Sequence, residues 1–228
     1  MTIRFLKEVE KVKKQILQIG ARVEESLRLA VRSVESIDGN LARQVIDSDE
    51  EIDQMEVELE EEVLKVLALH QPVAVDLRFL IAVLKMNNDL ERIGDLAVNI
   101  AQWTTFNGSQ PSSIVPTEIS KMAEVVQRML KSCLDCLVQM NAERALEVCR
   151  TDDEVDDLHR QMYVRIQDAI SKSPDNVDPL IHLLGVSRNL ERIGDLTTNI
   201  AEDVIYTIKG EIIRHGLGEQ LQDDEEPC

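Results

Sequence analysis

Pairs of acidic residues four positions apart are the side chains in this sequence whose types and spacing could do chemistry. Glu91 and Asp95 form one pair, and the same acids return one hundred residues later. Residues four apart lie on one face of a helix, about 6 Å apart at Cβ, so each pair would present two carboxylates together. The four pairs are Asp49 with Asp53, Glu91 with Asp95, Asp152 with Asp156, and Glu191 with Asp195.

These carboxylates would bind metal ions if the two pairs in each half of the chain faced each other. Close like charges are unfavourable unless protons or a cation compensate for them. Carboxylate oxygens suit hard cations such as Mg²⁺, Mn²⁺, Ca²⁺ or iron, and because carboxylates can bridge, one site could hold more than one ion. The alternative is an ordinary solvated acidic face, neutralised by neighbours such as Arg92 and Arg192. The residues alone leave both interpretations open.

The motif around these acids is duplicated, which favours a shared function. The segment LERIGDLAVNIA, residues 90–101, returns as LERIGDLTTNIA, residues 190–201, with ten of twelve positions identical. In the second copy the polar stripe runs on through Asn199 and Asp203. Gly94 and Gly194 are also repeated, although a glycine inside a helix costs about 1 kcal/mol relative to alanine. We therefore expect a close approach between helices at both glycines.

Other arrangements that bind metals or catalyse reactions fit less well. Residues 47–53 imitate the first ligands of an EF-hand, but Ile52 stands where that loop needs glycine. Ferritin-like di-iron sites need a histidine three residues after a glutamate, and glycine holds that place in both copies of the motif. We find no Ser-His-Asp pattern and no phosphate-binding glycine loop, so no catalytic residue is predicted.

The histidines, cysteines and large apolar residues are mostly expected to be structural. His182 lies in the apolar stretch LIHLLGV and is expected in the core, whereas His159 is a weaker candidate ligand beside the second set of acids. Cys133 and Cys136 form a CxxC inside an amphipathic helix and are expected to be reduced thiols. Trp103 is expected to anchor a packing contact or an interface. The methionines expected to fill the core are Met129, Met140 and Met162.

Long amphipathic helices must position all these residues. Apolar residues recur at helical spacing through residues 3–36, 40–69, 76–105, 117–140, 142–171 and 177–209. Glycine and proline mark the breaks, and FNGSQPSSIVPTE, residues 106–118, is the clear linker. The sequence predicts an all-α protein of two tandem, sequence-related three-helix bundles, packed in series or side by side. Their bounds are 1–107 and 118–210, with a linker at 108–117 and an acidic, disordered tail at 211–228.

The composition narrows the classes of partner. The formal net charge of −18 repels phosphate backbones and anionic lipids, so nucleic-acid binding is not expected. The sequence contains no run of about twenty apolar residues and no apolar segment of signal-peptide type at its start, so we expect a cytoplasmic protein without direct membrane insertion. The first helix exceeds what one small bundle needs, and we expect it to reach the second bundle or a dimer contact.

The repeated LERIGD, the upstream QPVAVDLRFL at residues 71–80 and the paired DxxxD segments together resemble the PhoU family of phosphate-uptake regulators. The resemblance covers almost the whole chain, from about residue 5 to 210. It implies two tandem three-helix bundles that bind metal through E(D)xxxD motifs, with the metal differing among members: iron, manganese, magnesium or zinc, in sites that can be multinuclear. The implied ligands are Asp49, Asp53, Glu91 and Asp95 in the first site, and Asp152, Asp156, Glu191 and Asp195 in the second.

The resemblance also implies a regulatory role without enzymatic activity. Such a protein would regulate phosphate uptake and repress the phosphate-starvation response, acting between the ATPase subunit of the phosphate ABC transporter and a phosphate-sensing histidine kinase. A homodimer is expected from the apolar helix faces. The alternative is a metal-dependent enzyme or a metal store built on a carboxylate bundle. The acidic segment at residues 219–228 is not a feature of the family, and no role is assigned to it.

Overall fold

Six helices make up nearly all of the described part of the chain. The computed structural model describes residues 3–107, 115–172 and 177–210. The first three helices are α1 (Ile3–Ser36), α2 (Gly39–His70) and α3 (Ala74–Asn107), and the others are α4 (Thr117–Gln139), α5 (Ala142–Lys172) and α6 (Val177–Lys209). The predicted helices and the all-α class are confirmed. The predicted tail, and most of the predicted linker, lie outside the described residues.

Local sequence explains where several helices begin and end. Asp38 caps α2 because its carboxylate accepts hydrogen bonds from the backbone N–H groups of Asn40, at 2.8 Å, and Leu41. Gln71 ends α2 in a left-handed conformation, and Pro72 follows it, so the helix cannot continue. Met140 ends α4 in the same way, with φ at 50°. The expectation that Met140 fills the core is therefore wrong, because this residue turns the chain at an exposed helix end.

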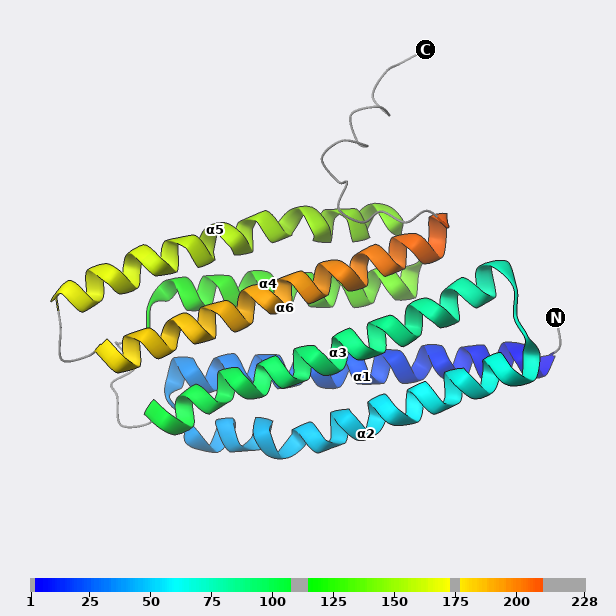
Figure 1. Ribbon diagram of the computed structural model, residues 1–228, viewed down its shortest axis with the longest axis horizontal. Coiled ribbons are helices and arrows are strands. Elements are labelled where there is room, and N and C mark those ends of the chain that lie inside the picture. The colour runs from blue at the N-terminus through cyan, green and yellow to red at the C-terminus, as the bar shows by residue number, and fades with distance from the viewer. Residues whose placement is uncertain (1–2, 108–114, 173–176, 211–228) are drawn as a thin grey trace, which may run out of the picture.

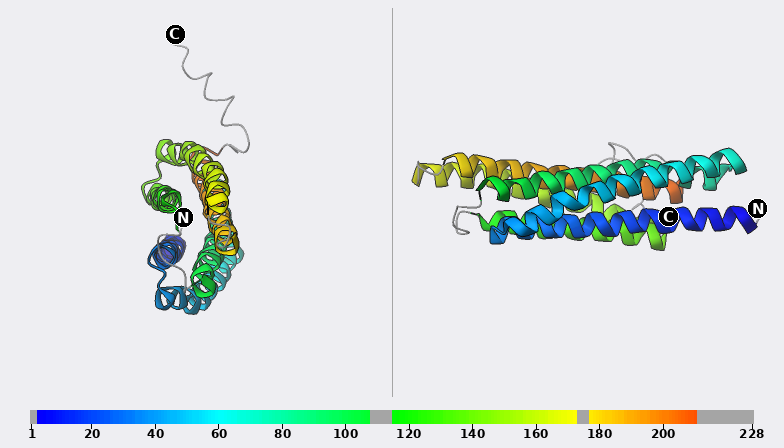
Figure 2. Two further views of the ribbon diagram at one scale, coloured as in Figure 1. Left: turned by 90° about the vertical axis from the view of Figure 1, so that its left-hand side faces the viewer. Right: turned by 90° about the horizontal axis from the view of Figure 1, so that it is seen from below.

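The two bundles lie side by side. Helices α1, α2 and α3 contact one another, as do α4, α5 and α6, and the bundles meet where α3 packs on α6 and α1 packs on α4. Figure 1 shows α3 and α6 running in opposite directions, so the second bundle is turned end for end relative to the first. Figure 2 shows an outer curved layer made of α2, α3, α6 and α5, with α1 and α4 behind it.

The core is aliphatic and continues across the seam between the bundles. Leucine, isoleucine, valine and alanine dominate the buried residues of all six helices. At the inner seam, Gly20 of α1 allows the side chain of Leu134 to approach so closely that a Cβ atom at position 20 would lie 2.6 Å from Leu134 Cδ2. At the outer seam, Lys85 of α3 pairs with the buried Asp203 of α6 at 2.9 Å. The expected contact of the first helix with the second bundle is confirmed.

Several single-residue expectations can be compared with the packing. Met129, Met162, Cys133 and Cys136 are buried, and both cysteines are free thiols. Trp103 is buried at 4% exposure and packs within the core. His182, however, is exposed, so its predicted place in the core is wrong. The reason is helical rotation, since α6 buries Leu180, Leu183 and Val186 while the positions between them face outward.

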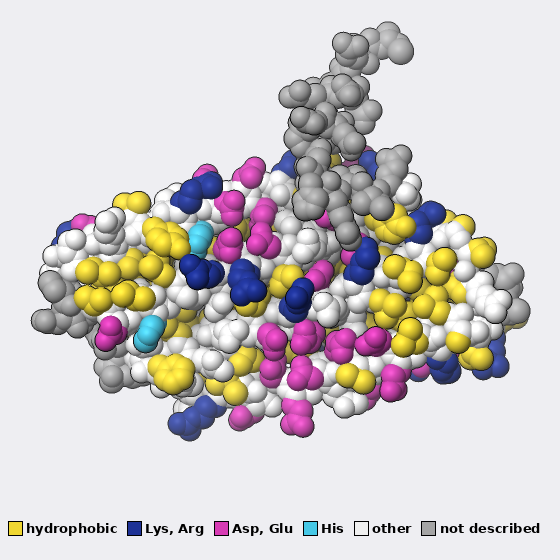
Figure 3. All heavy atoms as spheres, viewed as in Figure 1, with side chains coloured by type: hydrophobic (Ala, Val, Ile, Leu, Met, Phe, Trp, Pro, Cys, Tyr) yellow, Lys and Arg dark blue, Asp and Glu magenta, His cyan; other side chains and the backbone are white. Residues whose placement is uncertain are grey.

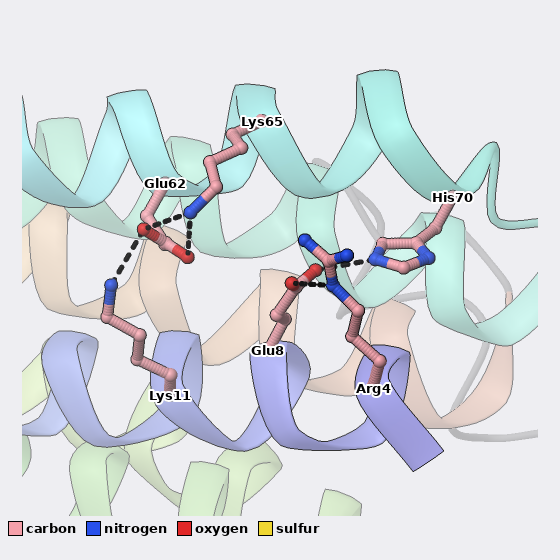
Figure 4. A network of polar contacts seen from close by, with 6 residues as sticks. All are labelled: Arg4, Glu8, Lys11, Glu62, Lys65 and His70. Carbon is pink, nitrogen blue, oxygen red and sulfur yellow. Dashed lines mark hydrogen bonds and ion pairs between the residues drawn. The ribbon is translucent and has the colours of Figure 1, made fainter. Parts of the chain in front are cut away.

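Polar contacts tie the start of α1 to the end of α2 (Figure 4). Glu8 accepts a hydrogen bond from Arg4 at 3.1 Å and meets His70 Nε2 at 2.5 Å. One helical turn further along α1, Glu62 forms ion pairs with Lys11 at 2.7 Å and with Lys65 at 3.3 Å. These pairs hold the long first helix against its neighbour. Within the described residues, none of the helices is both long enough and apolar enough to cross a membrane.

Candidate functional site

The first set of four acids gathers where α2 packs on α3. Burial raises the pKa of Asp49 to about 6, and the negative charges of Asp53 and Asp95 add to the effect. Burial also raises the pKa of Glu91, with further contributions from Asp95 and Asp53. A carboxylate can raise the pKa of another only when the two are close. The fold therefore brings Asp49, Asp53, Glu91 and Asp95 together, two from each helix.

The second set gathers at the equivalent place between α5 and α6. Burial raises the pKa of Asp152 to about 7, and the largest charge effects come from Asp195 and Asp156. The pKa of Glu191 and that of Asp195 are raised by burial and then by neighbouring acids of the same set, although Arg192 lowers both. In both bundles, therefore, the two acidic pairs lie close together, which is the arrangement that the sequence analysis gave as the condition for metal binding.

The repeated glycines let the helices approach beside each set. A Cβ atom at Gly194 would lie 2.8 Å from Asp152 Oδ1, so an alanine there would force the carboxylate to move. A Cβ atom at Gly94 would lie 3.4 Å from Ile52 Cδ1 and 3.6 Å from Asp49 Oδ1, which is an ordinary contact. The expected close approach is confirmed at both positions. It is tighter in the second bundle, where the acid lies directly against the glycine.

The acids converge without forming a ready-made coordination shell. Among the described residues, no three Asp, Glu, His or Cys side chains lie close enough together to hold a metal ion as they stand. The raised pKa values and this spacing are compatible, because charge repulsion acts over several ångströms whereas ligation requires oxygens about 2.0–2.6 Å from one ion. The donor chemistry fits a hard cation, and binding would require the carboxylates of each set to turn inward.

The residues next to the two carboxylate sets differ between the bundles. Of these residues, the sequence analysis considered only His159. In the first bundle, Glu56 adds charge near Glu91, and Asn87 donates a hydrogen bond to the Glu56 carbonyl at 2.8 Å. In the second bundle, His159 Nδ1 lies 2.7 Å from the hydroxyl of Ser187. The internal repeat could have pointed to these residues. Glu56 follows Asp53 by three residues, and His159 follows Asp156 by three residues, so the two occupy equivalent positions.

The polar stripe of the second motif does not extend into the site. Asp203 pairs with Lys85 of the other bundle instead of adding a charge to the carboxylate set. His159 is held by Ser187, and burial lowers the pKa of His159, with a further effect from Arg188. His159 is therefore mainly neutral near pH 7 and relieves less of the acidic charge than a protonated imidazole would.

Both sets open on the same face of the molecule. Figure 3 shows one group of acidic side chains over α2 and α3 and another over α5 and α6, with basic side chains between them. Arg92 and Arg192 of the two ERIGD motifs are exposed on the two central helices, and each lies close enough to lower the pKa of the preceding glutamate, Glu91 or Glu191. One face of the protein thus carries two acidic clusters separated by positive charge.

Comparison with known proteins agrees with this arrangement. The family model described as the PhoU domain matches twice, at residues 16–104 and 119–204. This chain belongs to the PhoU family. The two matches fall on the two three-helix bundles, one in each, so the repeat seen in the sequence is the repeat of the family.

Similar proteins match along most of the chain. A relative from Clostridium acetobutylicum, named a phosphate-specific transport system accessory protein PhoU homolog, is 38% identical and covers 90% of this chain and 94% of its own. The PhoU homolog of Pseudomonas aeruginosa is 35% identical over 93% of this chain and 88% of its own. The crystal structure of PhoU from Pseudomonas aeruginosa superposes with a TM-score of 0.85, covering 91% of this chain and all of that one. PhoU from Streptococcus pneumoniae gives a TM-score of 0.82 at 26% identity.

Proposed function

We propose that this PhoU-family chain is an accessory protein of a phosphate transport system that limits phosphate uptake and represses the phosphate-starvation response. The observation that carries the proposal is the double family match, with one set of four carboxylates at the equivalent place in each matched bundle. The names of the relatives, which are phosphate-specific transport system accessory proteins, supply the biological setting. The proposal gives the chain no catalytic step.

We further propose that each carboxylate set binds cations. Asp49, Asp53, Glu91 and Asp95 would hold one site, and Asp152, Asp156, Glu191 and Asp195 the other. A bound cation would neutralise part of the acidic face and offer open coordination positions to an anionic group of a partner or to phosphate. The half-buried positions of Asp49 and Asp152, together with their raised pKa values, support this role because such carboxylates gain most from a compensating cation.

An adaptor role follows if binding of cations and binding of partners are linked. The partners in this proposal are the ATPase subunit of a phosphate ABC transporter and a phosphate-sensing histidine kinase. A partner that contacts the face shown in Figure 3 would meet two strongly negative clusters without cations and less negative ones with them. The affinity for that partner would then depend on cation occupancy, and the coupling would be reciprocal. Association of two copies of the chain stays a prediction.

The regulatory proposal is tested by deleting the gene and measuring alkaline phosphatase activity in cells grown with abundant phosphate. High activity that the intact gene returns to a low level is the expected result, because the repressor would have been removed. Activity that stays low in the deletion strain would refute repression by this chain and leave control of transport flux to be measured by phosphate uptake.

The cation sites are tested by measuring metal content and Mn²⁺ binding of the Asp95→Asn, Asp195→Asn double variant. We expect binding to fall at least tenfold while the helix content stays that of the parent protein and the unfolding midpoint does not fall. Glu61→Gln with Asp135→Asn is the matched control, because it removes two exposed negative charges away from both sets. Equal Mn²⁺ binding in the parent protein and in both double variants would contradict the assignment.

A further inference from the structure

A groove with lysines along its rim lies beside the first half of α1, away from both carboxylate sets. Its volume is about 770 Å³, and residues of α1, α3 and α4 line it. Its surface is mainly apolar, with Ile16, Phe79 and Leu137 among the lining residues. The charged residues along it are Lys7, Lys11, Lys13 and Lys14, with Glu10 as the single acid among the lining residues.

The groove exists because the inner helices of the two bundles have unequal lengths. Helix α1 has 34 residues whereas its counterpart α4 has 23, and eleven residues of helix correspond to about 16 Å. The two helices touch at Gly20 and Leu134, and α4 ends shortly afterwards at Gln139. Figure 2 shows α1 running on past that end. The apolar face that α4 would cover if it were longer is left open.

The charge of the groove contrasts with that of the rest of the chain. The protein carries a net charge of −18, yet four lysines fall within residues 7–14. Lys11 pairs with Glu62, and the ammonium group of Lys13 lies 5.4 Å from the centre of the Phe79 ring. Among the described ion pairs, none involves Lys7 or Lys14. A ligand that combines apolar side chains with carboxylates would match both features of this groove.

The chain itself supplies such a segment, and the described part of the chain ends close to the groove. Gly210, with φ at 76°, packs on Arg78, which precedes the groove residue Phe79 in α3. The Nε atom of Arg78 is buried without a hydrogen-bond partner among the described residues. The sequence continues for eighteen residues, 211–228, and an extended segment of that length reaches about 60 Å. Reach is therefore no obstacle.

The sequence of this segment is complementary to the groove in both hydrophobicity and charge. Ile213, Leu217 and Leu221 are spaced by four, and the acids Asp223, Asp224, Glu225 and Glu226 follow them. We propose that the acidic segment 211–228 docks within its own chain on the lysine-rimmed groove of α1, α3 and α4. The leucines would cover the apolar floor while the acids meet the lysines. The segment would thereby act as a built-in competitor for any acidic, amphipathic partner that uses this groove.

Carbodiimide cross-linking of the full-length protein tests the proposal, because this reagent joins carboxylates to amines that are in direct contact. An equal mixture of unlabelled and ¹⁵N-labelled chains is treated at low micromolar concentration, and cross-linked peptides are identified by mass spectrometry. We expect links from residues 223–226 to Lys7, Lys11, Lys13 or Lys14, with both peptides carrying the same isotope. The Lys7→Glu, Lys14→Glu variant should reduce the links to the two remaining lysines at least fivefold.

Two further variants separate docking from incidental charge attraction. Lys121→Glu with Lys131→Glu makes the same charge change at exposed positions of α4 outside the groove, and should leave the links unchanged. Leu217→Ser with Leu221→Ser keeps every carboxylate and changes nothing within the described helices, yet should also reduce the links. Absence of links to the groove lysines, or links that are unaffected by the leucine changes, would overturn the proposal. Links only between chains of different isotope would overturn it in favour of a second copy.

Discussion

The first bundle holds its four carboxylates beside Glu56 and Asn87, whereas the second holds the same four beside His159 and Ser187. Asp49 of the first bundle is also less buried than Asp152, its equivalent in the second bundle. Accordingly, the pKa of Asp49 is raised to about 6, whereas the pKa of Asp152 is raised to about 7. Duplication has therefore preserved the acids and changed their surroundings. The two sites should differ in proton and cation affinity although their ligand sets are equivalent.

The inner helices differ between the bundles in another way. Helix α1 extends beyond α4, and Gly20 marks where the two touch. The acids lie on the outer layer and the groove lies behind it, so the two kinds of asymmetry are spatially separate. Changes at the seam, in the carboxylate sets and at the repeated glycines can therefore be examined one at a time.

The largest effect is expected at the seam between the inner helices. Gly20→Ala should lower the free energy of unfolding by about 1–2 kcal/mol, because overpacking against Leu134 outweighs the gain in helix propensity. Urea unfolding followed by circular dichroism measures the change. Gly185→Ala is the control, since no atom beyond its chain neighbours and the nearby backbone of its own helix lies within 4 Å of the added Cβ, and it should stabilise the protein by up to about 1 kcal/mol. Equal effects of the two changes would mean that the bundles are not closely packed at Gly20.

The next largest effect is expected from the pH dependence of stability, which should differ between the two carboxylate sets. Because the pKa of Asp152 is raised to about 7 from 3.8, the folded protein binds more protons than the unfolded chain within this window. The contribution of Asp152 to the free energy of unfolding should therefore fall as the pH rises from about 4 to 7 when a chelator is present. Asp152→Asn should remove part of this loss and stabilise the protein at pH 8 by about 1 kcal/mol, since solvent screening around a half-buried group limits the effect.

Asp49→Asn is the partner measurement in the first bundle. The pKa of Asp49 is raised only to about 6, so the stabilising effect at pH 8 should be roughly two-thirds as large and its pH window should end lower. Thermal unfolding at pH 5, 6, 7 and 8 compares the two variants. The difference between the bundles would be disproved if the Asp49 variant gained more stability than the Asp152 variant.

The repeated glycines provide a smaller and more local comparison. Gly94→Ala should raise stability by up to about 1 kcal/mol, because the new methyl group makes ordinary contacts and alanine favours the helix. Gly194→Ala should gain clearly less, since its methyl group must displace the carboxylate of Asp152. Unfolding midpoints in urea rank the two, and the midpoint of the Gly194 variant should be measured at pH 5 as well as pH 8. A larger gain at position 194 would contradict the tighter approach in the second bundle.

Exchanging the neighbours of the acids should have the smallest effect. His159→Glu gives the second bundle the acid that the first one has at the equivalent position, and should cost a few tenths of a kcal/mol at pH 8 through added repulsion. His159→Gln is the control because it keeps a neutral polar side chain of similar size. Differential scanning calorimetry with a chelator compares both with the parent protein. A more stable glutamate variant would show that charge repulsion does not govern this part of the site.

The helices, the repeat and the candidate acids could all be predicted from the amino-acid sequence. Helix ends could be predicted because capping and breaking are local, as at Asp38 and Pro72, where one or two residues decide whether the backbone continues. The spacing of Glu91 and Asp95 within one helix likewise fixed that both share a face. Duplication then pointed to both glycines as places where two helices meet.

How the helices face one another could not be predicted from the sequence and is known from the packed structure. The exposure of His182, the pairing of Asp203 with Lys85, and the position of His159 beside Ser187 all depend on rotations of neighbouring helices about their axes. Periodicity gives an apolar face, but it does not say which helix covers that face or where the cover ends. The convergence of the carboxylates and the open groove beyond α4 arise because packing across six helices fixes those rotations and offsets together.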